Sequence, residues 1–122
     1  MKKKILLLIE DNPLLTGIYK TAFEKKSVEV LLAHDGESGI ALAQNERPDV
    51  IVLDLLMPGI DGFEVLQRLK KDAQTKDIKV VVLTILTEEK AKAKAKKLGA
   101  VDYLIKSQLK LQEIVERVLA HF

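Results

Sequence analysis

The sequence predicts an α/β fold in which five parallel strands form one doubly wound sheet with helices on both faces. Five short runs rich in valine, isoleucine and leucine begin near Ile5, Val28, Val50, Val80 and Val101. Such continuous apolar runs are typical of strands that are covered on both faces, as in a parallel sheet. Helical patterns lie between the runs, and this alternation favours right-handed crossovers. Charged residues in the second and fifth runs are typical of edge strands.

The first and third of these helical patterns begin with capping residues. Asn12 followed by Pro13 offers an N-cap with proline at the first helical position, so we expect a helix to begin there. Asp61 with Glu64 resembles a capping box that opens the next such helix.

The last two helices are predicted from their apolar faces. Residues 88–98 place alanine and leucine on one stripe, and Gly99 is a helix stop. The lysines of this segment indicate a solvated face, with a basic docking surface as the alternative. Ser107 is predicted to begin the final helix, whose inward face comprises Leu111, Ile114, Val115, Val118 and Phe122.

Composition narrows the class of protein. The 122 residues suit one domain over 1–122. The chain has no cysteine, which excludes disulfides and thiolate zinc sites and fits a reducing, cytoplasmic location. The apolar run after the basic start at residues 1–4 is too short for export or for a membrane span. A formal charge of +2 does not indicate direct nucleic-acid binding.

Polar side chains stand at the ends of four apolar runs: Glu10 and Asp11 at the first, Asp54 at the third, Thr84 at the fourth and Lys106 at the fifth. Because ligands bind beyond the carboxyl ends of parallel strands, we expect these groups to form one site. Carboxylates about 4 Å apart repel by about 4 kcal/mol at an effective dielectric near 20. Mg²⁺ resolves that conflict and suits a site completed by a phosphoryl group.

Each of these residues also has a structural explanation when it is taken alone. Asp11 or Asn12 can cap the first helix, and Asp54 can end a strand before a turn. Thr84 is an ordinary strand former, and Lys106 can be a surface lysine. The combination favours a functional site, because chance seldom places these groups at four strand ends in this order.

The sequence resembles the receiver domain of two-component response regulators over essentially its whole length. The resemblance rests on the following motifs: Glu10-Asp11, Asp54 with Met57-Pro58-Gly59, Leu83-Thr84, and Gly99-Ala100 through Asp102-Tyr103 to Lys106. It implies the flavodoxin-like strand order 2-1-3-4-5.

The resemblance also implies the chemistry of the site. Asp54 would accept a phosphoryl group from a histidine kinase or a histidine phosphotransfer protein. The Mg²⁺ ligands would be the carboxylates of Glu10, Asp11 and Asp54 and the main-chain carbonyl of Leu56. Such a domain catalyses only its own phosphorylation and dephosphorylation, so we do not expect a conventional enzyme.

A switch is the third implication of the resemblance. Thr84 would bond the phosphoryl oxygens and Lys106 would neutralise them. Tyr103 would then rotate inward and alter the surface of the fourth helix, fifth strand and fifth helix, although an ordinary edge-strand tyrosine is the alternative. The expected output partner is a downstream effector domain or protein, and phosphorylation can promote a homodimer. Neither a membrane nor nucleic acid is an expected direct partner.

Three positions depart from the usual receiver pattern. Ile85 follows Thr84 where receivers generally carry a small residue, and its branched side chain is expected to crowd the phosphoryl site. Ser107 stands where a proline is common, often after a cis bond. Leu56 occupies a variable position that influences dephosphorylation. These differences bear on kinetics and remove no required group.

Other functions fit the sequence less well. A flavodoxin-like cofactor binder needs a glycine-rich phosphate loop, whereas residues 10–13 are acidic. An aspartyl-phosphate phosphatase of the haloacid dehalogenase type needs a second acid two positions after the nucleophile, where this chain has Leu56. A pseudo-receiver, which binds partners without phosphorylation, remains the alternative.

Overall fold

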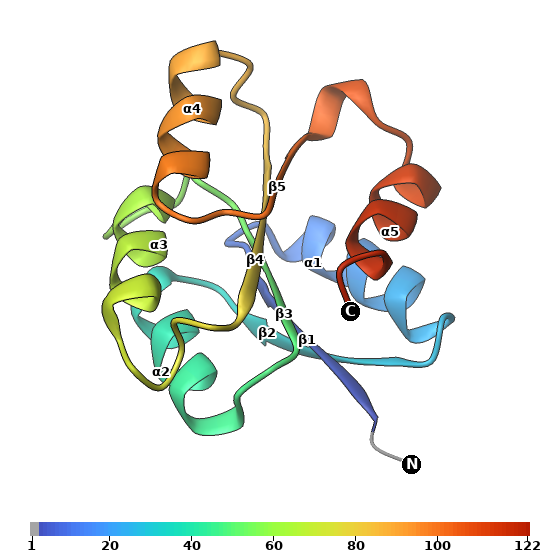
Figure 1. The fold of residues 1–122 in the computed structure, drawn as a ribbon. Coiled ribbons are helices and arrows are strands. Elements are labelled where there is room, and N and C mark those ends of the chain that lie inside the picture. The colour runs from blue at the N-terminus through green and yellow to red at the C-terminus, as the bar shows by residue number, and fades with distance from the viewer. Residues whose placement is uncertain (1–2) are drawn as a thin grey trace.

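A computed structural model describes residues 3–122, so Met1 and Lys2 of the basic start lie outside the described residues. Five parallel strands form one sheet in the order β2-β1-β3-β4-β5 (Figure 1). Their bounds are β1 (Lys4–Ile9), β2 (Val28–Ala33), β3 (Val50–Leu53), β4 (Lys79–Thr84) and β5 (Asp102–Ile105). The predicted fold class and strand order are confirmed, with the second and fifth strands at the edges.

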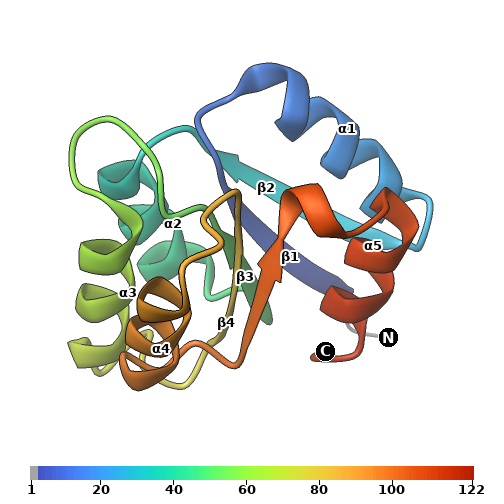
Figure 2. The same cartoon turned by 90° about the horizontal axis from the view of Figure 1, so that it is seen from above.

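Five α-helices cover the two faces of the sheet. They are α1 (Pro13–Glu24), α2 (Gly36–Glu46), α3 (Gly62–Lys71), α4 (Glu89–Lys97) and α5 (Leu111–Leu119). Figure 2 shows α1 and α5 on one face and α2, α3 and α4 on the other. Within residues 3–122, none of these helices is long and apolar enough to cross a membrane.

The core has two halves because successive strand residues point to opposite faces of the sheet. On one face Leu7, Ile51 and Val82 pack beneath α2, α3 and α4. On the other face Leu8 and Val52 pack beneath α1 and α5. The strands are therefore buried on both sides, which explains why their sequences read as uninterrupted apolar runs.

The predicted caps of α1 and α3 are confirmed. The Asn12 side chain accepts hydrogen bonds from the amides of Leu14 and Leu15, and Asp61 accepts one from the amide of Glu64. Helix α2 begins at a cap that was not predicted, since Asp35 accepts a hydrogen bond from the amide of Ser38. These caps satisfy N–H groups that a helix start leaves unpaired.

Gly99 ends α4 as predicted. It adopts a φ of 111°, which side chains other than glycine rarely adopt.

The predicted start of the last helix at Ser107 is wrong. Residues Lys106–Gln108 form a separate 3₁₀ turn, and α5 begins at Leu111, where Glu113 accepts a hydrogen bond from the amide of Lys110. The 3₁₀ turn lies between the end of β5 and the start of α5, which packs on the face of the sheet. As a first-turn residue, Leu111 stays 40% exposed, so its predicted inward orientation is also wrong.

The rest of the predicted inward face of α5 is confirmed. Ile114, Val115 and Val118 are buried, and Phe122 packs against the same cluster while staying partly exposed. No peptide bond within residues 3–122 is cis, so the Lys106–Ser107 bond is trans.

Candidate functional site

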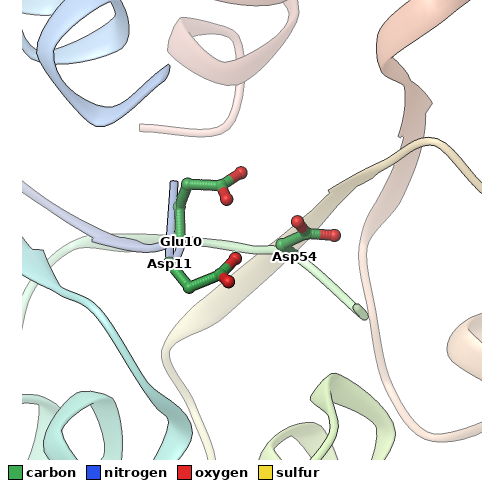
Figure 3. Close-up of side chains that lie close together, drawn as sticks. All are labelled: Glu10, Asp11 and Asp54. Atoms are coloured by element: carbon green, nitrogen blue, oxygen red, sulfur yellow. The ribbon is translucent and has the colours of Figure 1, made fainter. Parts of the chain in front are cut away.

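Three carboxylates meet at the carboxyl edge of the sheet. Glu10 and Asp11 follow β1, and Asp54 follows the neighbouring β3. Figure 3 shows Glu10 and Asp11 directed toward Asp54, and carboxylate oxygens of the three residues lie within 4.8 Å of one another. Glu10 and Asp54 are buried, with only 2% and 6% of their surfaces exposed. The predicted acidic cluster is therefore present, and its burial makes its repulsion costly.

Lys106 neutralises part of this charge. Its Nζ lies 2.5 Å from Glu10 Oε1 and 3.1 Å from Asp54 Oδ2, so one ammonium group bridges two acids from different strands. The ammonium reaches the acids because β5 ends on the same edge of the sheet as β1 and β3. The structure thus brings together four of the predicted site residues.

Backbone amides hold the two buried acids in place. Glu10 Oε2 accepts a hydrogen bond of 3.0 Å from the amide of Asn12, and Asp54 Oδ1 accepts one of 3.2 Å from the amide of Leu56. Each carboxylate is thus fixed by one amide and by the shared ammonium. The geometry is set before any ligand binds.

The pKa values of Glu10 and Lys106 are shifted by burial and by the short contacts of the two side chains. Burial raises the pKa of Glu10, and the nearby Asp54 adds to this, while the hydrogen bonds from Lys106 and Asn12 oppose it. Burial alone would lower the pKa of Lys106, but its bonds and attraction to the two carboxylates outweigh burial and raise it. Lys106 is therefore cationic over the physiological range.

Thr84 and Tyr103 lie on neighbouring strands beside the acids. Thr84 is the last residue of β4 and is fully buried, and its hydroxyl lies 3.4 Å from the amide of Leu86. Tyr103 on β5 is also buried, and its hydroxyl donates a 3.0 Å hydrogen bond to the Leu86 carbonyl, so the inward position expected after phosphorylation is already occupied in this structure. Both predicted switch residues therefore contact the segment that connects β4 to α4.

Gly62 is a site-positioning residue that the sequence analysis missed. A Cβ atom there would lie 2.4 Å from the Asp54 carbonyl oxygen and 2.5 Å from Leu55 Cα, which no real side chain permits. The absent side chain lets the start of α3 approach the end of β3. The signal in the sequence was a glycine directly after the Asp61 cap, where no turn requires one.

The two other predicted positions flank the site from outside. Leu56 and Ile85 are both exposed although both are large and apolar, and Ile85 is 60% exposed. Ile85 directly follows the end of β4. Its side chain is thus at the sheet edge that holds Asp54, and its effect on access stays a prediction.

Comparison with known proteins decides the family. The profile of the response regulator receiver domain matches residues 6–119, nearly the whole chain. The chain belongs to the response regulator receiver family. Receiver domains are signalling domains rather than conventional enzymes, and members of the family act with kinases and effectors.

Individual receivers agree with this assignment. Protein PilH of Pseudomonas aeruginosa is 42% identical over 103 residues, which cover 83% of this chain and 84% of PilH. The structure of chemotaxis protein CheY4 of Vibrio cholerae has a TM-score of 0.91 and 26% identity, and the match covers 99% of this chain and 100% of CheY4. A structure described as the Mn(2+)-bound form of response regulator Rcp1 has a TM-score of 0.81 and 30% identity, with coverage of 96% and 90%.

Many curated relatives are longer than this chain. The transcriptional regulator RpaA of Synechocystis is 40% identical over 115 residues, which cover 94% of this chain but 47% of RpaA. The chain spans about half the length of this relative.

The donor set of the receiver site fits a hard divalent cation. Receiver domains bind Mg²⁺, and this chain offers three carboxylates whose oxygens lie close enough to share one ion. The site offers no thiolate, since the chain has no cysteine. Glu10, Asp11 and Asp54 are therefore the side chains that could hold the metal.

Proposed function

We propose that this receiver accepts a phosphoryl group on Asp54 from a histidine kinase or a histidine phosphotransfer protein in the cytoplasm. The observation that carries the proposal is the bridge of Lys106 between Glu10 and Asp54 at the edge where three carboxylates converge. A structural salt bridge would need only one acid. Three acids, two of them buried, are explained by a site that binds a metal and a phosphoryl group.

The transfer would use Asp54 as the nucleophile. One of its carboxylate oxygens forms a bond to phosphorus while the phosphorus–nitrogen bond of a phosphohistidine, or the phosphorus–oxygen bond of acetyl phosphate, breaks. The electron pair leaves with the donor imidazole or with acetate. The amide of Leu56 and the ammonium of Lys106 orient the Asp54 carboxylate for this attack.

Mg²⁺ and Lys106 would together neutralise the phosphoryl oxygens. Mg²⁺ held by Glu10, Asp11, Asp54 and the Leu56 carbonyl would supply positive charge to the transferring phosphoryl group. Lys106 would leave Glu10 and pair with the phosphoryl oxygens instead. The Thr84 hydroxyl would donate a hydrogen bond to the same group. Its contact with the Leu86 amide is long, at 3.4 Å, so losing that contact would cost little free energy.

The switch would pass through Leu86. When Thr84 moves toward the phosphoryl group, it leaves the segment whose carbonyl is bound by Tyr103. Tyr103 would then change its position, and the surface of α4, β5 and α5 would change with it. A downstream effector domain or protein, or a second copy of the receiver, would read that surface.

Intact mass spectrometry tests the proposed function. After incubation with acetyl phosphate and Mg²⁺, the parent should gain one phosphoryl unit, and Asp54→Asn should gain none. Asp35→Asn is a matched control, because Asp35 is an exposed helix cap and asparagine caps equally well. Equal labelling of all three proteins would contradict the proposal, and no labelling of the parent would favour a pseudo-receiver.

A further inference from the structure

The net positive charge of the chain comes from one helix. α4 contains five lysines and one glutamate, so this helix alone carries a formal charge of +4. The whole chain carries +2, which leaves the remaining residues with −2. We call the side chains of Lys90, Lys92, Lys94, Lys96 and Lys97 the α4 lysine surface.

These lysines form two rows along α4. Lys90, Lys94 and Lys97 are four and three residues apart and share one side, whereas Lys92 and Lys96 share another. Figure 2 shows α4 between α3 and β5. Lys94 Nζ lies 4.3 Å from the centre of the Phe63 ring on α3, so the first row is on the α3 side of the helix and the second is on another side.

The lysines of the α4 lysine surface are without ion pairs within residues 3–122, although Glu89 lies on the same helix. None of its five ammonium groups forms an ion pair with a carboxylate within residues 3–122 (Lys94 instead contacts the Phe63 ring). Lysines four apart, such as Lys90 and Lys94, destabilise an isolated helix by repulsion. Within α4 only Ala95 is fully buried, so packing offsets little of this repulsion. A partner with negative charge would remove it.

We propose that the α4 lysine surface docks an acidic segment of a protein partner. The inference rests on the proposed function, because this helix belongs to the surface that phosphorylation would change. Ala93 is exposed between the two rows. Its short side chain lets a partner backbone come close, so that carboxylates on either side of the partner segment can reach both rows.

The composition of the α4 lysine surface favours a protein over nucleic acid. The surface has no arginine for bidentate contacts with bases and no aromatic side chain for stacking. The net charge of +2 also provides little long-range attraction for a polyanion. Short-range pairing between lysine and carboxylate therefore suits the site better.

Docking would be sensitive to the state of the switch. The Tyr103 hydroxyl holds the Leu86 carbonyl, and Leu86 lies only three residues before α4 begins. A change at Tyr103 would shift the start of α4 and the spacing of its lysines from β5. The acidic segment would thus bind the phosphorylated and unphosphorylated receiver with different affinities.

A fluorescent helical peptide built from alanine and glutamate serves as the probe. Its affinity is measured by anisotropy at low and high salt, with and without acetyl phosphate and Mg²⁺. The Lys92→Gln/Lys96→Gln variant should bind roughly tenfold more weakly than the parent, since it loses two lysine–carboxylate pairs near the surface. The control Lys25→Gln/Lys26→Gln removes the same charge from exposed residues that follow α1, and its affinity should stay close to that of the parent.

The controls separate this inference from the proposed function. Equal peptide affinity for the two variants, or a DNA duplex that binds as tightly as the peptide and is equally sensitive to Lys92 and Lys96, would overturn the inference. Intact mass checks that all three proteins take up a phosphoryl unit. If no protein takes up a phosphoryl unit but Lys92→Gln/Lys96→Gln still binds the peptide more weakly than the control, the proposed function is rejected and the docking surface is kept.

Discussion

Removal of the Lys106 ammonium should destabilise the fold in a way that depends on pH. In Lys106→Met the side chain keeps most of its apolar stem, and the two acids lose their shared partner. The side chains of Glu10, Asp54 and Lys106 are 3%, 8% and 12% exposed, so both ion pairs of Lys106 are largely buried. Breaking a buried pair typically costs about 3 to 5 kcal/mol, because a charge stays buried without compensation.

Lys106→Met should lose less stability than this, because Glu10 can take up a proton when its cationic partner is removed. We expect a loss of about 2 kcal/mol in the free energy of unfolding at pH 7 without Mg²⁺, which lowers Tm by about 6 to 10 °C. Burial raises the pKa of Glu10 even in the parent, and the variant lacks the Lys106 bond that opposes this shift.

The sign of the pH dependence follows from that pKa. A carboxyl whose pKa is higher in the folded chain than in the unfolded chain costs no stability below its unfolded pKa, which is about 4.3 for glutamate. The loss of stability grows as the pH rises from this unfolded-state pKa through the higher pKa of the carboxyl in the folded chain. The difference between parent and Lys106→Met should therefore be small at pH 4 and largest near pH 7.

Urea unfolding of both proteins at several pH values measures this difference. Lys26→Met is the control, since Lys26 is exposed and forms no ion pair with residues 3–122. An equal loss in the control, or a loss in Lys106→Met that does not change between pH 4 and pH 7, would refute the reasoning.

Three further predictions concern the surroundings of Asp54. Millimolar Mg²⁺ should raise Tm, with a gain of about 1.4 kcal/mol at about ten times its dissociation constant, and Asp11→Ala should abolish this gain; a gain that persists in Asp11→Ala would mean that Asp11 does not hold the metal. Ile85→Ala should make both loading by acetyl phosphate and hydrolysis faster, as measured by intact mass and phosphate release; unchanged rates would mean that Ile85 does not cover the site. Gly62→Ala should cost about 1 to 3 kcal/mol in urea unfolding, because its Cβ would lie 2.4 Å from the Asp54 carbonyl oxygen. Its control, Gly17→Ala, has no atom within 4 Å of the new Cβ and should be neutral or stabilising.

Much of the fold could be predicted because the strands are buried on both faces. Residues such as Leu7 and Leu8 face opposite halves of the core, so every position in the run must be apolar. The caps at Asn12 and Asp61 were also local, since each side chain bonds amides two or three residues away. Local signals of this kind survive in a single sequence.

The start of α5 could not be predicted because it is set by tertiary geometry. Ser107 is a good N-cap by residue type, yet the chain must first turn from the sheet edge to the opposite face. The 3₁₀ turn does this, and the helix then begins where Glu113 bonds the amide of Lys110. Which residue starts the helix depends on how α5 packs against α1 and the sheet, which is not encoded locally.

The members of the site could be predicted, but their contacts could not. Strand ends place Asp54 and Lys106 on one edge, whereas the bridge from Lys106 to both Asp54 and Glu10 depends on side-chain conformation. Gly62 was missed for a similar reason. Its role is the close approach of α3 to the end of β3, and only the packed structure shows it.

Localising the phosphoryl group within the chain tests the central claim most directly. The protein is incubated with acetyl phosphate and Mg²⁺ and treated with borohydride, which reduces an aspartyl phosphate to a homoserine side chain, and the peptides are then sequenced by mass spectrometry. We predict that the reduced residue is found at position 54 and at no other carboxylate, and that it is absent without Mg²⁺. Reduction at Glu10 or Asp11, or none at position 54 in a protein that has gained a phosphoryl unit, would contradict the account.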